Sequence, residues 1–406
     1  MLDPSRLKAF PAYFILPDLT EIVAPLCEFK SNPNEQQATE NLSGWFGSFG
    51  PCRNERERRL SLSHSFERFG SLTFPLADCE HLETCIKFLM WSFAFDDISD
   101  EGELQAEPES IKVGVDLCAK VLDTPLSAPL PTYKYAAMLH DIWSRVCSNA
   151  SPSACRRFVL STKVWIYSQV EQAGNRSEST VPHVKDFVDL RRRTFGGMTA
   201  EAMAMYTMHS DIPDYVWCEP VMTEISNATQ DLMIWPNDLC SFNKEQADGD
   251  YHNLVMAVML EHDLDLQTAI NFVSSMLAKR VKEYMELKKQ IPSFGPKVDE
   301  EIARYLTAIE HCIQGATRWY YGKRYFRDLD ITNRNFLVVP VFKSSRPKPV
   351  SPSQTAPQAT FSAEKQTSHG GLLSLVSVTL SVIFISFAFF VSFDSSSNPH
   401  FLRTGL

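Results

Sequence analysis

The clearest hydrophobic pattern in the chain lies in residues 78–95. Apolar side chains recur there at the spacing i, i+3, i+4, i+7, i+8 and i+11, at Leu82, Cys85, Ile86, Leu89, Met90 and Phe93. This spacing puts all of them on one face of an α-helix. Asp78 is the expected N-cap, because a short carboxylate before an apolar run accepts hydrogen bonds from the N–H groups of the first turn. The stretch therefore predicts an amphipathic helix with one buried face.

Most of the remaining chain shows the same helical character. Helices separated by proline-containing turns are expected from about 110 to 172, and helical periodicity returns from about 252 to 290. No alternating apolar and polar run of useful length indicates a strand, and no internal repeat is present. The predicted fold class is therefore all-α.

Composition narrows the class of protein. The chain has 406 residues, of which 44% are hydrophobic, so it can bury a sizeable core. The formal net charge of -10 argues against general nucleic-acid binding, and no nucleic-acid partner is expected. The ten cysteines form no Cys-x-x-Cys pair, which argues against a zinc ribbon or a redox motif. Scattered cysteines in a chain of this length fit buried thiols in a reducing compartment.

An acidic cluster stands at the C-terminal end of the first predicted helix, in the sequence Asp96-Asp97-Ile98-Ser99-Asp100-Glu101. Carboxylates at a helix C-terminus oppose the macrodipole, at a cost of roughly 0.3–1 kcal/mol each when exposed, and they repel one another. Cations that neutralise the cluster would explain why it is there. Asp96 and Asp100 are four residues apart and share a helix face. The alternative is an exposed acidic helix end.

A second candidate site lies in Trp235–Glu245, where Asn237, Ser241 and Glu245 stand at i, i+4 and i+8. On a helix this spacing stacks an amide oxygen, a hydroxyl and a carboxylate on one face. Mg²⁺ prefers such oxygen ligands, usually shared with water and substrate phosphates. Lys244 sits beside the last of them, where it could meet an anion. The alternative is the solvated polar face of an ordinary helix. Under either interpretation, Pro236 is expected to start or bend the helix where the candidate ligands begin.

Two cationic stretches complete the candidate chemistry. Three consecutive arginines, Arg191–Arg193, project in three directions on a helix, so only one or two of them can face a cavity. We expect two of the three to belong to a basic surface patch. A planar guanidinium suits a diphosphate. The following Gly196-Gly197 pair should break the helix, as happens where backbone approaches a ligand closely. Later in the chain, Arg324 and Tyr325 could donate hydrogen bonds to an anion, or could simply end a helix.

Taken together, these motifs resemble those of class I terpene synthases, and within them the sesquiterpene synthases of fungi. Asp96–Asp100 is similar to the aspartate-rich D-D-x-x-D motif, and Asn237–Glu245 matches the N-D-x-x-S-x-x-x-E metal triad in full. Arg324-Tyr325 resembles the terminal R-Y pair, and Arg191 lies where the diphosphate-sensing arginine belongs. The opening residues 14–19 are also similar to those of such enzymes. The resemblance covers about residues 10–335.

The resemblance implies a helical bundle around a central apolar cavity, with the two metal motifs facing each other across its mouth. Three Mg²⁺ ions would hold the substrate diphosphate. The implied metal ligands are Asp96, Asn237, Ser241 and Glu245, and the implied diphosphate-binding residues are Arg191, Lys244, Arg324 and Tyr325. The implied catalytic residues are Asp96, Arg191, Asn237, Ser241 and Glu245. Asp97 and Asp100 are expected to act behind the ligands or in closure of the site.

The implied function is that of a sesquiterpene synthase, which ionises farnesyl diphosphate with Mg²⁺, cyclises the carbocation and releases diphosphate. Cavity walls that stabilise a cation should be apolar and aromatic. The candidates are Phe93, Phe95, Trp235 and Trp319, and Phe195 lies at the expected helix break, a region that by resemblance senses ionisation.

Two alternatives belong to other classes. A chain-elongating prenyltransferase, or an enzyme for another chain length, would also use a prenyl diphosphate, but a prenyltransferase usually carries two aspartate-rich motifs. A non-catalytic, membrane-anchored helical protein would have decayed motifs, whereas the Asn237–Glu245 triad is intact.

The C-terminus departs from this family. The catalytic domain is expected over 1–343, and residues 344–370 are rich in Pro, Ser, Thr and Gln, as disordered linkers are. Residues 371–393 contain no charged side chain, and such a helix would extend roughly 30–35 Å, enough to cross a bilayer core. We expect a transmembrane helix there and a short polar tail over 394–406. The protein would be a single-pass, tail-anchored membrane protein with a cytosolic catalytic domain. The alternatives are an apolar helix docked on the domain and an erroneous extension of the gene model.

Overall fold

Helix α6 (Cys79–Asp100) confirms the helix predicted from the pattern of residues 78–95. Asp78 caps it as expected: its carboxylate accepts the N–H of His81 at 2.9 Å, and its carbonyl accepts the N–H of Leu82 at 2.9 Å. On the predicted apolar face, Leu82, Cys85 and Ile86 are completely buried. The sequence pattern therefore located both the start and the inner face of this helix.

The computed structural model describes residues 1–100, 108–177, 180–321, 325–326 and 336–343, with only the backbone described at 97–100 and 176–177. Two short 3₁₀ turns, η1 (Pro4–Arg6) and η2 (Asp214–Cys218), and two strands, β1 (Tyr13–Pro17) and β2 (Phe336–Pro340), accompany the helices. The α-helices are α1 (Leu19–Val23), α2 (Glu35–Thr39), α3 (Leu42–Ser48), α4 (Glu55–Leu62), α5 (Phe66–Thr73), α6, α7 (Pro108–Asp123), α8 (Lys134–Asn149), α9 (Pro152–Ser177), α10 (Val184–Thr194), α11 (Gly197–Thr207), α12 (Pro220–Asp248), α13 (Leu254–His262), α14 (Leu266–Lys288) and α15 (Pro296–Trp319).

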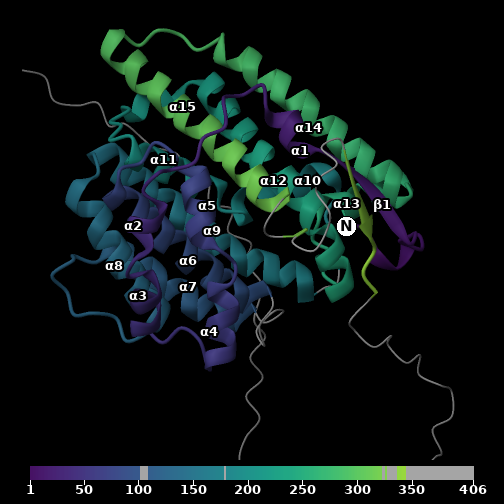
Figure 1. Cartoon of the computed structure of the whole chain (residues 1–406), viewed down its shortest axis with the longest axis horizontal. Coiled ribbons are helices and arrows are strands. Elements are labelled where there is room, and N and C mark those ends of the chain that lie inside the picture. Colours follow the sequence, from purple (N-terminus) through teal and green to yellow (C-terminus); the bar gives the residue numbers. More distant parts are fainter. Residues whose placement is uncertain (101–107, 178–179, 322–324, 327–335, 344–406) are drawn as a thin grey trace, which may run out of the picture. The chain divides into compact units, whose positions relative to one another are not determined.

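The long helices pack around a shared interior (Figure 1). Helix α12 lies against α14 and α15, α11 lies against α9 and α15, and α6 lies against α5 and α8. Helices of this length bury one apolar stripe each, and a ring of them encloses a space that none could enclose alone. All ten cysteines are free thiols, as their scattered spacing predicted, but only four of them are buried and Cys218 is exposed.

A two-stranded antiparallel ribbon departs from the all-α prediction. Strand β1 pairs with β2, with Ile15 opposite Val338, and thereby joins the two ends of the described chain. Phe14 and Leu16 of β1 are buried while their neighbours are more exposed, which is the alternation of a strand with one covered face. Each strand is only five residues long, too short for its alternation to stand out in the sequence.

The expected membrane anchor is not supported, and the predicted fold class and localisation are corrected accordingly. Among the residues that the structure describes, no helix is both long and apolar enough to cross a bilayer, because the long helices carry charged side chains along their length. The segments predicted as linker (344–370), membrane span (371–393) and tail (394–406) lie outside the described residues. We therefore withdraw the transmembrane helix, and with it the tail anchor and the membrane as a partner.

Candidate active site

The bundle surrounds a cavity of about 470 Å³ whose lining comes from α5, α6, α9, α10, α11, α12 and α15. Along α6 the lining passes from Phe88 and Phe93 to Asp96, and along α12 it passes from Met233 to Asn237 and Glu245. Both walls therefore change from apolar to oxygen-rich toward the C-terminal ends of their helices. The cavity has one region suited to a hydrocarbon chain and another suited to cations.

The structure brings the two predicted metal motifs to this one cavity. Its lining includes Asp96 from the aspartate-rich motif and Asn237 and Glu245 from the triad. Ser241, between them on α12, is 1% exposed and is not among the lining residues. Asp97, Asp100 and Arg324 lie outside the residues whose side chains are described; their predicted roles stay predictions.

Helix α12 presents the triad without the interruption that Pro236 suggested. It begins at Pro220, well before the triad, and runs through Pro236 to Asp248. The triad residues therefore do not start a helix, so a helix start at Pro236 is wrong, and the predicted alternative of a bend at Pro236 stays a prediction. Because the helix is continuous, its 3.6-residue turn sets the spacing between the side chains of Asn237 and Glu245.

Arg191 is anchored at the side of the cavity by two residues of the triad segment. Its guanidinium donates to Asp238 Oδ1 at 2.9 and 3.2 Å and to Asn237 Oδ1 at 3.2 Å. Its side chain is 13% exposed and lines the cavity. Held in this way, the guanidinium is oriented at the polar region of the cavity, where a bidentate cation suits an anionic ligand.

The other predicted anion-binding residues also lie at this wall. The hydroxyl of Tyr325 accepts a hydrogen bond from Asn237 Nδ2 at 3.3 Å, and Tyr325 lines the cavity. Lys244 lines it as well, and its ammonium lies 3.4 Å from the carboxylate of Asp248. Asn237 is thus in contact with Arg191 on its oxygen side and with Tyr325 on its nitrogen side.

The three consecutive arginines point in three directions, as predicted. Arg193 pairs with exposed Glu171 at the surface. Arg192 does not belong to a surface patch: it forms a bidentate pair, 2.8 Å for each bond, with Asp231. Only Arg191 of the three lines the cavity.

Asn253 is a residue that the sequence reasoning missed. It is completely buried, and its Nδ2 donates to Glu245 Oε2 at 2.8 Å, to the carbonyl of Asp238 at 2.7 Å and, at 3.4 Å, to Ser241 Oγ. Its Oδ1 accepts the N–H of Val255 at 2.9 Å and so caps α13. Because the cap fixes the amide oxygen, the amide nitrogen must face the triad. An Asn before an apolar run is a cap signal, but nothing local shows what its nitrogen touches.

The polar region concentrates negative charge away from water. Burial, followed by the charges of Asp250 and Asp238, raises the pKa of Glu245 to about 7. Burial also raises the pKa of Asp238, which Arg191 partly offsets. Crowded carboxylates with one guanidinium among them form a donor set that a divalent cation would stabilise, and the amide, hydroxyl and carboxylate oxygens are the types that Mg²⁺ prefers. The residues present therefore fit the metal that the motifs imply.

The helix break expected at Gly196-Gly197 is present and faces the cavity. Helix α10 ends at Thr194, Gly196 adopts φ 81°, and α11 begins at Gly197. A positive φ of this kind favours glycine. Phe195 lines the cavity at the break, and the guanidinium of Arg191 lies 5.5 Å from the centre of its ring. The break thus brings backbone, ring and cation together at one point of the wall.

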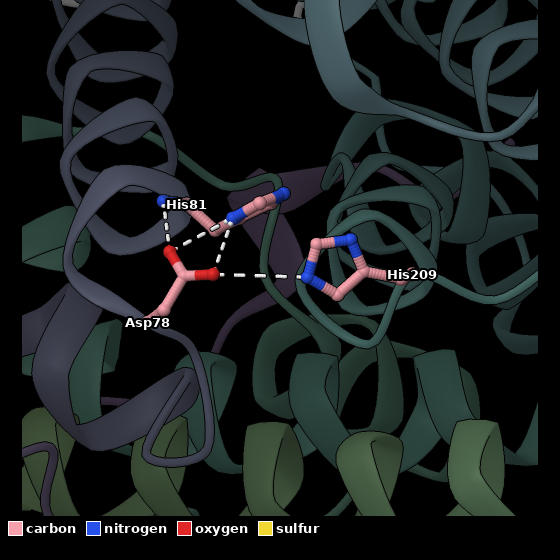
Figure 2. A group of neighbouring side chains, drawn as sticks. All are labelled: Asp78, His81 and His209. Carbon is pink, nitrogen blue, oxygen red and sulfur yellow. Dashed lines mark hydrogen bonds and ion pairs between the residues drawn. The ribbon is translucent and has the colours of Figure 1, made fainter.

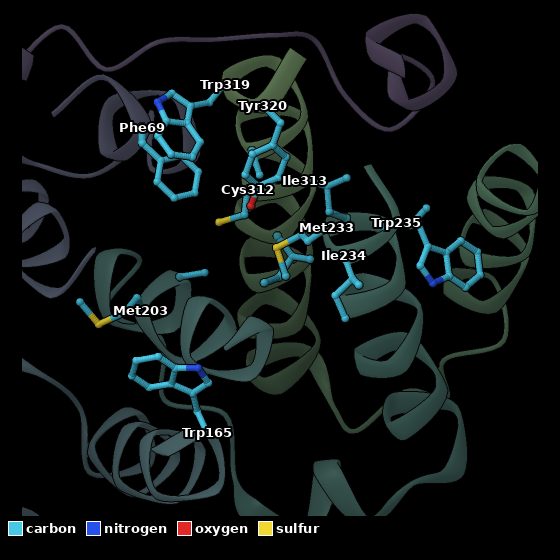
Figure 3. Packing of buried hydrophobic residues seen from close by; sticks show 14 of the residues in the cluster. Phe69, Trp165, Met203, Met233, Ile234, Trp235, Cys312, Ile313, Trp319 and Tyr320 are labelled. Atoms are coloured by element: carbon cyan, nitrogen blue, oxygen red, sulfur yellow. The ribbon is translucent and has the colours of Figure 1, made fainter. Parts of the chain in front are cut away.

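Only one of the four aromatic lining candidates on the helices lines the cavity. Phe93 does so, whereas Phe95, Trp235 and Trp319 are not among the lining residues. Figure 3 shows Trp235 on the side of α12 away from Met233, and Trp319 beside Phe69, on which it stacks with ring centres 4.2 Å apart. The aromatic rings that line the cavity are those of Phe69, Phe74, Phe88, Phe93, Trp165, Phe195, Tyr320 and Tyr325.

A helical bundle around one cavity, lined by Asp96 from the first predicted metal motif and by Asn237 and Glu245 from the second, is the arrangement that the resemblance to terpene synthases implied. The family model for terpene synthase family 2, C-terminal metal binding, matches residues 87–283. The chain is 31% identical to sesquiterpene synthase Agr1 of Cyclocybe aegerita over 321 residues, covering 77% of this chain and 88% of the relative. It is 30% identical to alpha-muurolene synthase of Coprinopsis cinerea over 328 residues, covering 78% and 75%.

The chain belongs to the terpene synthase family, and it is a terpene cyclase of the sesquiterpene synthase type that its motifs predicted. The fold agrees: the crystal structure of an a-eudesmol synthase superposes with a TM-score of 0.66 at 19% identity, covering 73% of this chain and 97% of that one. The predicted use of a divalent metal follows from the same family.

Proposed function

We propose that this enzyme ionises farnesyl diphosphate with Mg²⁺, cyclises the resulting carbocation and releases diphosphate. The observation that carries the proposal is the one cavity whose lining combines the carboxylates of Asp96 and Glu245 with aromatic and aliphatic side chains. A prenyl diphosphate has the same two parts, an anionic head and an apolar chain. Several relatives are named sesquiterpene synthases, which favours the fifteen-carbon substrate.

The proposed metal ligands are Asp96 on one side and Asn237, Ser241 and Glu245 on the other, with three ions expected. Bound there, Mg²⁺ would neutralise the negative charge that develops on the departing diphosphate. Ser241 contributes one of these oxygens from a buried position, and Asn253 lies between Ser241 and Glu245. The protein's part is to keep these oxygens at fixed spacing on a continuous helix.

The proposed diphosphate-binding residues are Arg191, Lys244, Arg324 and Tyr325. Arg191 is already oriented by Asp238, so little side-chain entropy is lost when it meets an anion. Tyr325 and Arg191 both contact Asn237. A ligand that engages either side chain would therefore also act on a proposed metal ligand.

The apolar region of the cavity has to keep the cation away from water until cyclisation is complete. Ring faces attract cations by about 0.5–2 kcal/mol each. Phe88 and Phe93 of α6 and Trp165 of α9 line the same space, so a cation formed there would meet rings from two helices. Their arrangement would select the way in which the chain folds before each bond forms.

Product analysis tests the proposal directly. The purified full-length chain is incubated with Mg²⁺ and, separately, with geranyl, farnesyl and geranylgeranyl diphosphate, and the extracts are examined by gas chromatography with mass detection. We expect a cyclic hydrocarbon or alcohol from the farnesyl substrate, absent when a chelator is added. A cyclic product from only another chain length, or a longer linear diphosphate, would contradict the proposed substrate and favour the prenyltransferase alternative.

A further inference from the structure

A second cluster of possible metal ligands lies at the other end of α6 from the candidate active site. Asp78 precedes the first residue of α6, His81 lies in its first turn, and His209 follows α11 in the turn after Thr207 (Figure 2). Asp96 stands eighteen residues after Asp78 on the same helix, which at 1.5 Å per residue separates the two sites by about 27 Å. The cluster is therefore distinct from the site described above.

The ligand atoms of these three side chains already lie close together. They are all within 4.8 Å of one another. His81 Nδ1 lies 2.8 Å from Asp78 Oδ1 and 2.9 Å from Oδ2, and His209 Nε2 lies 3.7 Å from Oδ2. Ligand atoms around a tetrahedral zinc ion with bonds of 2.0–2.1 Å are about 3.3 Å apart. The observed separations bracket that value, so small side-chain movements would complete the arrangement.

The backbone brings His209 to Asp78 from a separate helix. His209 adopts φ 50° and its N–H donates to the carbonyl of Tyr206 at 3.1 Å, at the end of α11. Glycine is the usual residue at such a left-handed helix end. Here the position carries an imidazole instead, and Figure 2 shows it facing the carboxylate of Asp78.

Helix capping accounts for only part of the cluster. A capping Asp78 explains the bond from the backbone N–H of His81. It does not explain why the imidazole of His81, whose side chain is 4% exposed, holds Nδ1 against both carboxylate oxygens. Nor does it explain the approach of His209. A metal ion would take the place of the proton that His81 Nδ1 shares with Asp78, and it would use both imidazoles and the carboxylate together.

We propose that Asp78, His81 and His209 form a site for a divalent first-row transition metal of the zinc type, which fastens the start of α6 to the end of α11. Two imidazoles and one carboxylate suit such a metal and not Mg²⁺, which prefers oxygen. The side chains of Asp78 and His209 are 54% and 57% exposed, so metal can enter from solvent and water can occupy the remaining coordination position. Both helices also line the cavity, so a metal ion that links them would restrict the movement of its walls.

Zinc titration of the full-length, chelator-treated protein tests this site. Zn²⁺ binding is measured by calorimetry and by thermal unfolding. Both are done in excess Mg²⁺, which occupies the oxygen-rich candidate active site, so that Zn²⁺ binding there does not contribute to the signal. We expect one equivalent of Zn²⁺ to bind and to raise the unfolding temperature. His209→Ala should weaken Zn²⁺ binding by more than the 10- to 100-fold that the loss of an outer-shell partner typically causes. Asp78→Asn, which keeps a good cap, should do the same.

His183→Ala is the matched control. His183 is an exposed histidine whose Nδ1 lies 3.4 Å from Glu261, and no third metal ligand stands beside this pair among the described residues. Its replacement should leave Zn²⁺ binding unchanged. If the wild-type protein gains no thermal stability with Zn²⁺, or if His209→Ala and Asp78→Asn both bind Zn²⁺ as tightly as the wild type, the proposal is overturned.

Discussion

Two buried aspartates on α12, Asp231 and Asp238, both form ion pairs with arginine, but the arginines lie in different surroundings. Both side chains are almost completely inaccessible to solvent, at 1% and 0%. Asp231 receives two guanidinium groups, from Arg192 and from Arg280. Asp238 receives one, from Arg191, and its other oxygen accepts the N–H of Leu254 at 3.0 Å.

The difference lies in what the arginines do on their other side. Arg192 and Arg280 are not among the residues that line the cavity, whereas Arg191 is. The first pairing therefore locks α10 and α14 onto α12. The second does the same for α10 and α13 and also presents a positioned cation to the cavity. One helix thus uses the same kind of ion pair for packing at Asp231 and, as proposed, for substrate binding at Asp238.

The largest expected effect is at the cavity end of this comparison. Glu245→Ala should abolish measurable turnover, which means a loss of at least about 10²- to 10³-fold, because it removes a proposed metal ligand. The fold should remain, since the change removes one of several crowded carboxylates. Product formation and the far-ultraviolet circular dichroism spectrum are the measurements. Normal product formation by a folded variant would rule out the metal assignment.

Replacing the two neighbouring arginines by lysine tests the comparison itself. Arg191→Lys should lower turnover about 100-fold, because lysine cannot bind Asp238 and an anion with the same planar fork. Arg192→Lys should lower the free energy of unfolding by about 1–2 kcal/mol, with Arg280 still on Asp231, and should leave turnover within a few-fold. Steady-state kinetics and urea unfolding of both variants give the answer. Equal losses of turnover would show that the two ion pairs do not differ in function.

A smaller effect on activity is expected at Asn253, which contacts the triad residues Ser241 and Glu245. Asn253→Asp keeps the cap of α13 but replaces the amide nitrogen that donates to Glu245 by an acceptor. The Mg²⁺ concentration for half-maximal activity should rise about 10- to 100-fold, and stabilisation by Mg²⁺ with inorganic diphosphate should weaken in thermal unfolding. Asp265→Asn, a change at the cap of α14, is the control. A matching loss in that control would mean that only helix capping was at stake.

The smallest effect on activity is expected at Glu201, a buried carboxylate that is not among the cavity-lining residues. It accepts hydrogen bonds from Ser226 and Tyr305, and burial raises its pKa from 4.5 to about 7. The folded state therefore holds this proton more tightly than the unfolded state. The resulting stability is complete below pH 4.5 and is lost as the pH rises through about 7.

Glu201→Gln should remove this pH dependence, which amounts to about 3 kcal/mol. The wild-type protein should lose more unfolding free energy than the variant when urea unfolding is compared at about pH 5 and about pH 8. Turnover of the variant at neutral pH should match that of the wild type. Parallel pH profiles of stability for the two proteins would contradict this assignment.

The sequence was most informative where one helix carries the whole signal. The apolar face of α6, its cap at Asp78 and the spacing of Asn237 and Glu245 all follow from the 3.6-residue period, and the structure has each of them. The break at Gly196 was equally visible, because two adjacent glycines interrupt an otherwise helical pattern.

What the sequence left out depends on contacts between distant segments. Trp319 was a lining candidate, yet its neighbour Tyr320 lines the cavity, because one residue turns a helical side chain by about 100°. Asn253 looks like an ordinary cap until the triad is seen beside it. The membrane prediction rested only on the absence of charged side chains in residues 371–393, and no contact with the folded domain supported it.

The ribbon of β1 and β2 has a consequence for how the enzyme is made. The carbonyl of Pro340, the last residue of β2, accepts a hydrogen bond from Asn243 at 2.8 Å, and the carbonyl of Phe342 just beyond the strand accepts one from Gln246 at 2.8 Å. Both partners flank Lys244 and Glu245 on α12. A nascent chain still short of these residues leaves that end of α12 without its last partners. Synthesis must therefore reach Phe342, 96 residues after Gln246, before α12 can make these contacts beside the triad.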